Sequence, residues 1–180
     1  MTAPELVVLL DEDGTPVGSA PKAEVHSTET PLHLAFSCYV LDARGRTLIT
    51  RRALSKQTWP GVWTNACCGH PAPGEAVEVA IARRMREELG LEVTGIRPVL
   101  PDFRYRAVAA DGIVENEICP VFVGQVAGDP APAPDEVEEW AWLEVDELVT
   151  AIGAAPMVFS PWSVEQVAQM REQGVLPRAG

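Results

Sequence analysis

The sequence predicts a single α/β domain, an α+β sandwich in which helices flank a mixed β-sheet. Two observations lead to this prediction. Short apolar runs bounded by Gly, Pro, Asn and Asp recur along the chain, as is typical of strands. Between residues 75 and 89 the apolar spacing changes to a helical period, and two shorter helical patterns follow near the C-terminus. Without an internal repeat, this mixture favours one layered domain over residues 1–180, with its core from about residue 5 to 173.

The N-terminal part of the chain is expected to form strands. The apolar run Leu6–Leu10 ends at an Asp-Gly turn. A longer strand is expected from His33 to Leu41, joined through an Asp-Ala-Arg-Gly turn to residues 47–50, as in a hairpin. The Trp-Pro-Gly-Val-Trp segment at 59–63 indicates a rigid aromatic loop.

A helix is expected from Glu75 to Leu89. Four apolar residues recur at every fourth position and form one stripe: Val77, Ile81, Met85 and Leu89. Gly90 follows at the position where a left-handed residue commonly ends a helix. The remaining predicted elements are strands at 103–109, 113–126 and 137–143 and helices at 145–152 and 163–173.

Composition and charge exclude several classes of function. Hydrophobic residues make up 47% of the chain and charged residues 22%, which is ordinary for a globular domain. The formal net charge of -12 argues against a nucleic-acid partner, because phosphate backbones select basic surfaces. No apolar run is long enough to span a bilayer and no secretion signal is evident, so a cytoplasmic protein without a membrane partner is expected. The four cysteines are then expected to be reduced thiols.

A motif for diphosphate chemistry coincides with the predicted helix. It consists of Gly69, five residues, Glu75, seven residues and then the run Arg-Arg-Met-Arg-Glu-Glu-Leu-Gly-Leu at 83–91. This motif of the sequence resembles the Nudix box. That resemblance implies a Nudix-like mixed sheet flanked by helices, with helical carboxylates that hold magnesium and a diphosphate. Where the box has a glutamate, this chain has Arg84, which removes a metal ligand and adds a cation that can bind phosphate oxygens directly. We therefore expect diphosphate binding without the activation of water by several metal ions.

Three histidines and two glutamates form a candidate metal site. Glu115 and Glu117 are two residues apart on a predicted strand, so they point to one face, roughly 6.5–7 Å apart. Two carboxylates on a mostly apolar strand are costly unless they are paired or bind metal. With His26, His33 and His70 they would complete a five- or six-coordinate site suited to manganese, zinc or magnesium.

Motifs between about residue 5 and residue 170 resemble the type 1 isopentenyl-diphosphate isomerase family. They comprise residues 32–37, 51–56, 59–65, 68–71, 105–106 and 112–117. The resemblance implies an enzyme of isoprenoid biosynthesis that interconverts isopentenyl diphosphate and dimethylallyl diphosphate through a carbocation. Its partner would be this small-molecule substrate, and the chain would be a monomer or a homodimer.

The resemblance also implies a role for each candidate residue. Cys68 would be the essential thiol, Glu117 a proton carrier and Tyr105 a hydroxyl beside it. The implied ligands of Mn²⁺, or of another divalent ion such as Zn²⁺ or Mg²⁺, are His26, His33, His70, Glu115 and Glu117. Glu88 would help to hold Mg²⁺ with the diphosphate, near Cys68. The implied substrate-binding residues are Lys22, Arg52, Lys56, Arg84 and the aromatic wall Trp162.

The residues leave two other functions open. A Nudix pyrophosphohydrolase that acts on a nucleoside diphosphate derivative would be expected to carry glutamate at position 84 and not to need Cys68. A metal-stabilised binding module without catalysis would use Cys68 and the histidines structurally, and their replacement would unfold it.

Overall fold

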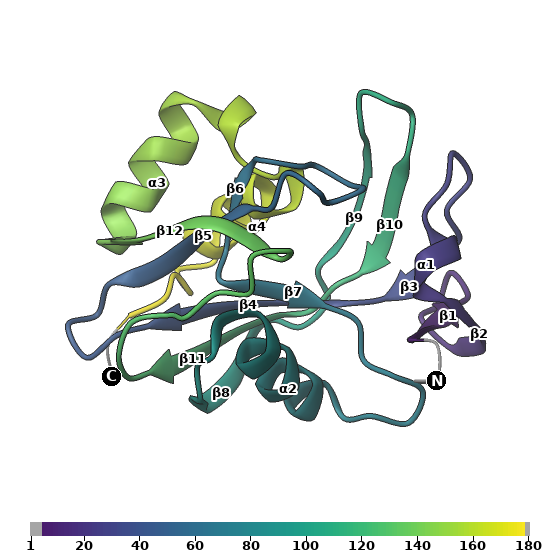
Figure 1. The fold of residues 1–180 in the computed structure, drawn as a ribbon, viewed down its shortest axis with the longest axis horizontal. Helices are drawn as coiled ribbons and strands as arrows, with labels where there is room; N and C mark the ends of the chain where they lie inside the picture. The colour runs from purple at the N-terminus through teal and green to yellow at the C-terminus, as the bar shows by residue number, and fades with distance from the viewer. Residues whose placement is uncertain (1–4, 179–180) are drawn as a thin grey trace.

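The strands form two sheets in the computed structural model, which describes residues 5–178 (Figure 1). The smaller sheet has the order β2-β1-β3-β10-β9. Its strands are β1 (Leu6–Leu10), β2 (Pro16–Pro21), β3 (His33–Leu34), β9 (Arg104–Val108) and β10 (Val114–Ile118). A short helix, α1 (Lys22–Val25), follows β2 beside this sheet.

The larger sheet has the order β12-β5-β4-β11-β8, with β6 paired to β5 and β7 paired to β4. Its strands are β4 (Phe36–Leu41), β5 (Thr47–Arg52), β6 (Trp63–Thr64), β7 (Cys67–Gly69), β8 (Val93–Leu100), β11 (Val121–Val126) and β12 (Val137–Leu143). The other helices are α2 (Val77–Leu89), α3 (Val145–Ala154), a 3₁₀ turn η1 (Pro156–Val158) and α4 (Pro161–Glu172). None of the helices between residues 5 and 178 combines the length and apolar character needed to cross a membrane.

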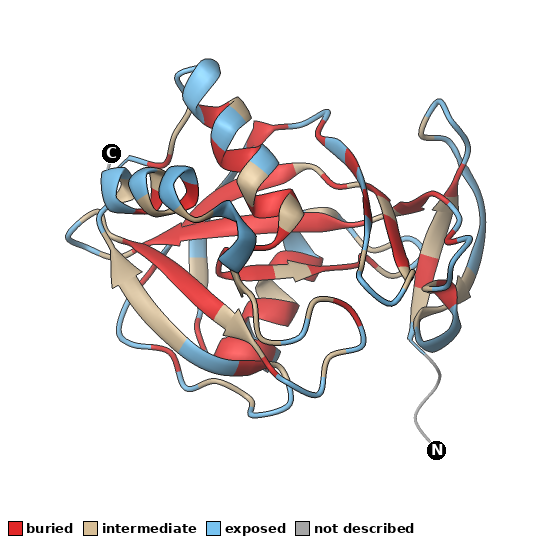
Figure 2. Cartoon of the chain, turned by 90° about the horizontal axis from the view of Figure 1, so that it is seen from above, coloured by how far each residue is buried: buried red, intermediate tan, exposed pale blue. Residues whose placement is uncertain are grey.

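The larger sheet is covered on both faces, so the predicted α+β sandwich is confirmed. All six residues of β4 are buried, and successive side chains point to opposite faces. Phe36 and Val40 belong to a core with residues of α2, whereas Tyr39 belongs to a second core with residues of α3 and α4. Figure 2 shows these central strands mostly buried and the helices buried only along their inner sides.

Two of the predicted strands are divided between the sheets, which corrects the expectation of a continuous strand at 33–41 and at 113–126. The first is interrupted at Ala35 and the second at residues 119–120. The two segments nevertheless run side by side through the interruption, because Ala35 donates its amide hydrogen to the Ile118 carbonyl at 2.9 Å and Ser37 to the Pro120 carbonyl at 3.1 Å. Proline lacks an amide hydrogen, which favours a break in the ladder at this point.

Helix α2 confirms the predicted stripe and the predicted helix end. Ile81, Met85 and Leu89 are fully buried. Gly90 has a φ of 65° and its amide hydrogen-bonds to the Arg86 carbonyl, which closes the last turn. The helix begins at Val77, two residues later than predicted.

Other boundaries differ because pairing partners were not visible in the sequence. Strand β2 pairs with β1 although it contains two prolines, and β8 pairs with β11; neither was predicted. Part of the predicted aromatic loop forms β6, which pairs with β5. The predicted hairpin of β4 and β5 pairs at Leu41 and Thr47, next to the turn, while β7 occupies the far end of β4.

The packing of α2 gives a prediction for stability. Ile81→Ala removes a fully buried side chain from the core beneath β4 and should lower the free energy of unfolding by about 2–5 kcal/mol. Val79→Ala in the same helix serves as the control, because Val79 is 58% exposed and its loss should change stability by less than about 0.5 kcal/mol. Urea unfolding of both variants measures the difference, and equal midpoints would contradict this packing.

Candidate functional site

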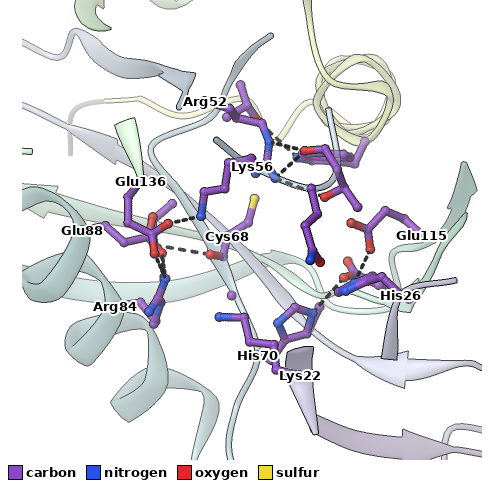
Figure 3. Close-up of a pocket in the computed structure, with 18 of the residues that line it drawn as sticks. Lys22, His26, Arg52, Lys56, Cys68, His70, Arg84, Glu88, Glu115 and Glu136 are labelled. Atoms are coloured by element: carbon purple, nitrogen blue, oxygen red, sulfur yellow. Dashed lines mark hydrogen bonds and ion pairs between the residues drawn. The ribbon is translucent and has the colours of Figure 1, made fainter. Parts of the chain in front are cut away.

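A cavity of about 500 Å³ is lined by residues of both sheets and of helices α1, α2 and α4. It contains most of the side chains that the sequence singled out: Lys22, His26, Arg52, Lys56, Cys68, His70, Arg84, Glu88, Tyr105, Glu115, Glu117 and Trp162. The remaining one, His33, is fully buried behind the cavity wall. Figure 3 shows the imidazoles of His26 and His70 on one side, the Arg84–Glu88 pair on the other, and the Cys68 sulfur between them.

Four of the five predicted His/Glu ligands converge closely. One ligand atom from each of His26, His33, His70 and Glu117 lies within 4.8 Å of every other. Parallel pairing of β3 with β10 sets His33 opposite Glu117, and His70 follows β7 directly. Glu115 lies at the border of this cluster, with its Oε2 2.9 Å from Nε2 of His26.

The cluster fits a divalent cation because its buried polar atoms lack partners. His33 donates its Nδ1 hydrogen to the Pro31 carbonyl at 2.9 Å, so the lone pair of Nε2 points toward the cluster. Among the described residues, four buried atoms here lack a well-aligned hydrogen bond, although Nε2 of His26 lies 2.9 Å from Oε2 of Glu115: Nε2 of His26, Nε2 of His33, Nδ1 of His70 and Oε2 of Glu115. Buried polar atoms are rarely left unpaired, so four in one cluster indicate a missing ligand.

The titration behaviour of Glu117 and His70 also suits metal binding, whereas the pKa of His33 is raised, because the lowering effect of burial is outweighed by the contact with Glu117. Burial alone would raise the pKa of Glu117, but contacts with His33 and His70 hold that pKa well below its ordinary value. Burial lowers the pKa of His70, against the opposing effect of its 3.1 Å hydrogen bond to Glu117. An ionised carboxylate and a neutral imidazole are the forms that coordinate metal.

The Cys68 thiol stands beside this cluster on β7, where it is the cross-strand partner of Ser37 on β4. It donates a hydrogen bond to Oδ1 of Asn65 at 3.1 Å, and its sulfur lies 3.3 Å from the Ser37 hydroxyl. Burial raises the pKa of the thiol to about 11, although hydrogen bonds with Ser37 and Asn65 act in the opposite direction. The neighbouring Cys67 points instead into the core beneath α2.

Two aromatic side chains close the cavity near the thiol and the carboxylate. Tyr105 is the cross-strand partner of Glu117, so both side chains lie on one face of the small sheet. Burial raises the pKa of Tyr105 well above its ordinary value, which keeps the phenol protonated as a hydrogen-bond donor. The Trp162 ring lies 5.7 Å from the Tyr105 ring and donates its Nε1 hydrogen to Thr64.

The basic residues on the opposite side are already paired. Arg84 contacts Glu88 at 2.5 Å and Glu136 at 3.1 Å, and Lys56 pairs with the same Glu136. Burial raises the pKa of Glu88, while the charge of Arg84 opposes that rise. Sequence reasoning missed Glu136, since it follows a proline-rich connector outside every motif.

The two remaining predicted cations are held by other groups. Lys22 pairs with Glu5 at 3.0 Å. Arg52 donates to the Thr58 carbonyl at 2.8 Å, and its guanidinium lies 5.4 Å from the centre of the Trp162 ring. The loop carbonyls therefore orient Arg52, whereas the Glu5 carboxylate neutralises Lys22.

The chain matches known proteins over almost its whole length. The NUDIX domain family matches residues 31–162. A protein of Mycolicibacterium vanbaalenii named isopentenyl-diphosphate Delta-isomerase is 58% identical over 95% of this chain and 94% of its own length. One of the same name from Paenarthrobacter aurescens is 54% identical over 98% of this chain and 96% of its own length.

Solved structures share the fold at lower identity. DR0079 from Deinococcus radiodurans superposes with a TM-score of 0.71 at 20% identity, over 92% of this chain and 98% of its own. A MutT protein from Methanosarcina mazei superposes with a TM-score of 0.64 at 19% identity, over 82% of this chain and 99% of its own. Because the profile covers most of the chain and the curated relatives cover nearly all of it, the chain belongs to the isopentenyl-diphosphate Delta-isomerase family of Nudix-domain proteins.

Proposed function

We propose that this chain interconverts isopentenyl diphosphate and dimethylallyl diphosphate through a carbocation, as a step of isoprenoid biosynthesis. One observation carries the proposal: a single cavity holds a thiol between a His/Glu cluster and a set of basic side chains. The names of relatives that are 54% and 58% identical support the same activity.

The double-bond shift needs two proton-transfer groups. One carbon of the alkene gains a proton, and another carbon then loses one. Cys68 and Glu117 are the two groups assigned to these transfers, and each such group typically contributes about 10²–10⁴-fold. Tyr105, beside Glu117 and protonated, orients the carboxylate through its hydroxyl.

The cationic intermediate has to be shielded from water. The Trp162 ring face can stabilise it by about 0.5–2 kcal/mol, a factor of roughly 2–30. That is too little to account for catalysis, so exclusion of water by the buried Trp162 and Tyr105 side chains matters at least as much.

His26, His33, His70 and Glu117 would hold a divalent ion, with Glu115 completing the set. Mn²⁺, Zn²⁺ and Mg²⁺ all suit these nitrogen and oxygen donors. When bound, the ion would supply positive charge that changes the acidity of Glu117. Because Glu117 is both a ligand and a proton carrier, the metal site belongs to the acid/base apparatus.

The diphosphate would bind among Lys22, Arg52, Lys56 and Arg84, together with Mg²⁺ held by Glu88. Its binding energy then positions the alkene between Cys68 and Glu117. The hydrolase alternative is disfavoured by Arg84, which stands where the Nudix box has a glutamate and pairs with the carboxylates of Glu88 and Glu136 that could otherwise bind several metal ions.

For the reaction itself, the first prediction concerns the Cys68 thiol. Cys68→Ala should lower kcat at least about 10²-fold, because it removes one of the two proton-transfer groups. The measurement is formation of dimethylallyl diphosphate from isopentenyl diphosphate with magnesium, and phosphate release is followed in the same samples. Cys67→Ala is the matched control and should keep kcat within about twofold, since that thiol faces the core.

Full isomerase activity in a folded Cys68→Ala chain would refute the thiol assignment. Phosphate without isomer from the unchanged chain would favour the hydrolase instead. Unfolding of Cys68→Ala, when Cys67→Ala folds, would favour the metal-stabilised binding module.

A second prediction concerns the diphosphate. Arg84→Ala should raise KM by about tenfold to a hundredfold, because a charge-assisted contact with the phosphates is lost. Arg86→Ala is the control from the same helix; its side chain is 58% exposed and pairs with Glu92 on the surface. Equal KM values for the two variants would show that position 84 does not contact the substrate.

A third prediction concerns the metal cluster. Adding Mn²⁺ or Zn²⁺ to the chelator-treated protein should raise Tm in a concentration-dependent way, since the ion binds the folded state. His26→Ala should remove most of that rise, whereas Glu24→Ala, on the exposed side of α1, should retain it. A rise in Tm that is unchanged in His26→Ala would place the ion elsewhere.

A further inference from the structure

A line of buried hydrogen bonds leads from helix α4 to the Cys68 sulfur. Three of its side chains, Ser37, Tyr39 and Gln166, have no exposed surface. The Tyr39 hydroxyl donates to Oε1 of Gln166 at 3.0 Å, and Nε2 of Gln166 donates to Oγ of Ser37 at 2.8 Å. Oγ of Ser37 in turn lies 3.3 Å from the sulfur of Cys68.

These hydrogen bonds run in one direction, from Tyr39 through Gln166 to Ser37. Burial raises the pKa of Tyr39 well above its ordinary value, so its hydroxyl keeps its hydrogen and donates it. Gln166 accepts this hydrogen at Oε1, which leaves its amino group to donate to Ser37. Ser37 therefore accepts from Gln166, and its own single hydrogen is left for a sulfur.

Two sulfurs are close enough to receive that hydrogen. Oγ of Ser37 lies 3.3 Å from Cys68 and 3.4 Å from Cys119. A hydroxyl oxygen has two acceptor sites and one hydrogen. All contacts are satisfied when Gln166 and the Cys119 thiol both donate to Ser37, and Ser37 donates to Cys68.

On the opposite side of the Cys68 thiol, the hydrogen-bond partner Asn65 also has a fixed orientation. Asn65 donates its Nδ2 hydrogens to the carbonyl oxygens of Cys38 at 3.1 Å and Cys67 at 2.9 Å, so its Oδ1 faces the thiol. Cys68 donates to that Oδ1 at 3.1 Å. The sulfur is thus held between one acceptor, Asn65, and one donor, Ser37.

We propose that Ser37 is a positioning residue for the Cys68 thiol, and that Gln166 and Tyr39 act on the reaction only through the direction of the Ser37 hydroxyl. The donor from Ser37 contacts the sulfur whether or not the sulfur carries a proton. It therefore holds the sulfur in place through the proton transfer, while the bond to Asn65 exists only in the protonated form. This inference rests on the proposed isomerase function and on its assignment of Cys68.

The test compares Ser37→Ala, Gln166→Met and the double variant in the isomerase assay. Ser37→Ala should lower kcat about tenfold with KM within about twofold, because one hydrogen bond to a reacting group is lost. Gln166→Met should lower kcat about threefold in the unchanged chain and should have no further effect in the Ser37→Ala chain. If the two substitutions acted independently, their fold-reductions of kcat would instead multiply.

Ser163→Ala is the matched control. Ser163 is also a buried serine with hydroxyl hydrogen bonds, but these go to Ser160 and not to the thiol, so kcat should change by less than about twofold. Tyr39→Phe provides a second route if Ser37→Ala does not fold, and it should lower kcat about twofold at constant KM.

Several outcomes would overturn the inference. These are unchanged kcat in folded Ser37→Ala, effects of Ser37→Ala and Gln166→Met that multiply, or a loss in Ser163→Ala equal to that in Ser37→Ala. If Ser37→Ala does not fold, unchanged kcat in both Gln166→Met and Tyr39→Phe overturns it. Absence of isomerase activity in the unchanged chain would be a failure of the proposed function and not of the positioning role alone.

Discussion

The parallel course of residues 33–41 and 114–126 is the constraint on which the site depends. The two segments leave the smaller sheet together and enter the larger one together, still hydrogen-bonded across the break. His33 lies opposite Glu117 in one sheet, and Ser37 lies opposite Val121 in the other. A slip of one residue between β3 and β10 would turn Glu117 away from His33. Ser37, on the same segment as His33, is placed opposite Cys68 by the antiparallel pairing of β4 with β7. The segment at 33–41 therefore contributes to both the metal cluster and the support of the thiol, through its pairing with β10 and with β7.

The charge distribution of the cavity follows from the cost of burying an unpaired ion. The chain carries a net charge of -12, and its cavity gathers the cations Lys22, Arg52, Lys56 and Arg84 together with several glutamates. In the free protein Lys56 and Arg84 share the carboxylate of Glu136, and Lys22 is paired with Glu5. Under the proposed function, diphosphate binding would exchange these carboxylate oxygens for phosphate oxygens. Such an exchange would position the diphosphate without leaving unpaired charges in a cavity of low dielectric.

Local signals predicted the elements that depend on local physics. The α2 stripe and its end at Gly90, the run Leu6–Leu10 and the strand at 137–143 were all found from periodicity and turn residues. The division at Ala35 and at residues 119–120 was missed, because pairing between distant segments decides it. Pro120 was a usable signal for a break within a strand. Strand β2 was missed because its exposed, proline-containing sequence lacks an apolar alternation.

The candidate site could also be predicted only in part from the sequence. The His/Glu ligands, Cys68 and the basic residues were named from motifs, and the fold gathers them around one cavity. Their partners were not named: Glu136 lies outside every motif, and Ser37 and Gln166 resemble ordinary core residues until their contacts are seen. Motifs identify the groups that meet the substrate, whereas the groups that orient them are determined by packing between segments far apart in sequence.

The central claim is that two different groups, Cys68 and Glu117, add and remove the protons of the double-bond shift. Isomerisation of isopentenyl diphosphate in D₂O tests it most directly, with the product analysed by NMR. Two separate groups that exchange with solvent predict dimethylallyl diphosphate with deuterium in one of its methyl groups. A product without deuterium would mean that one group carries the same proton between the two carbons, and it would contradict the account.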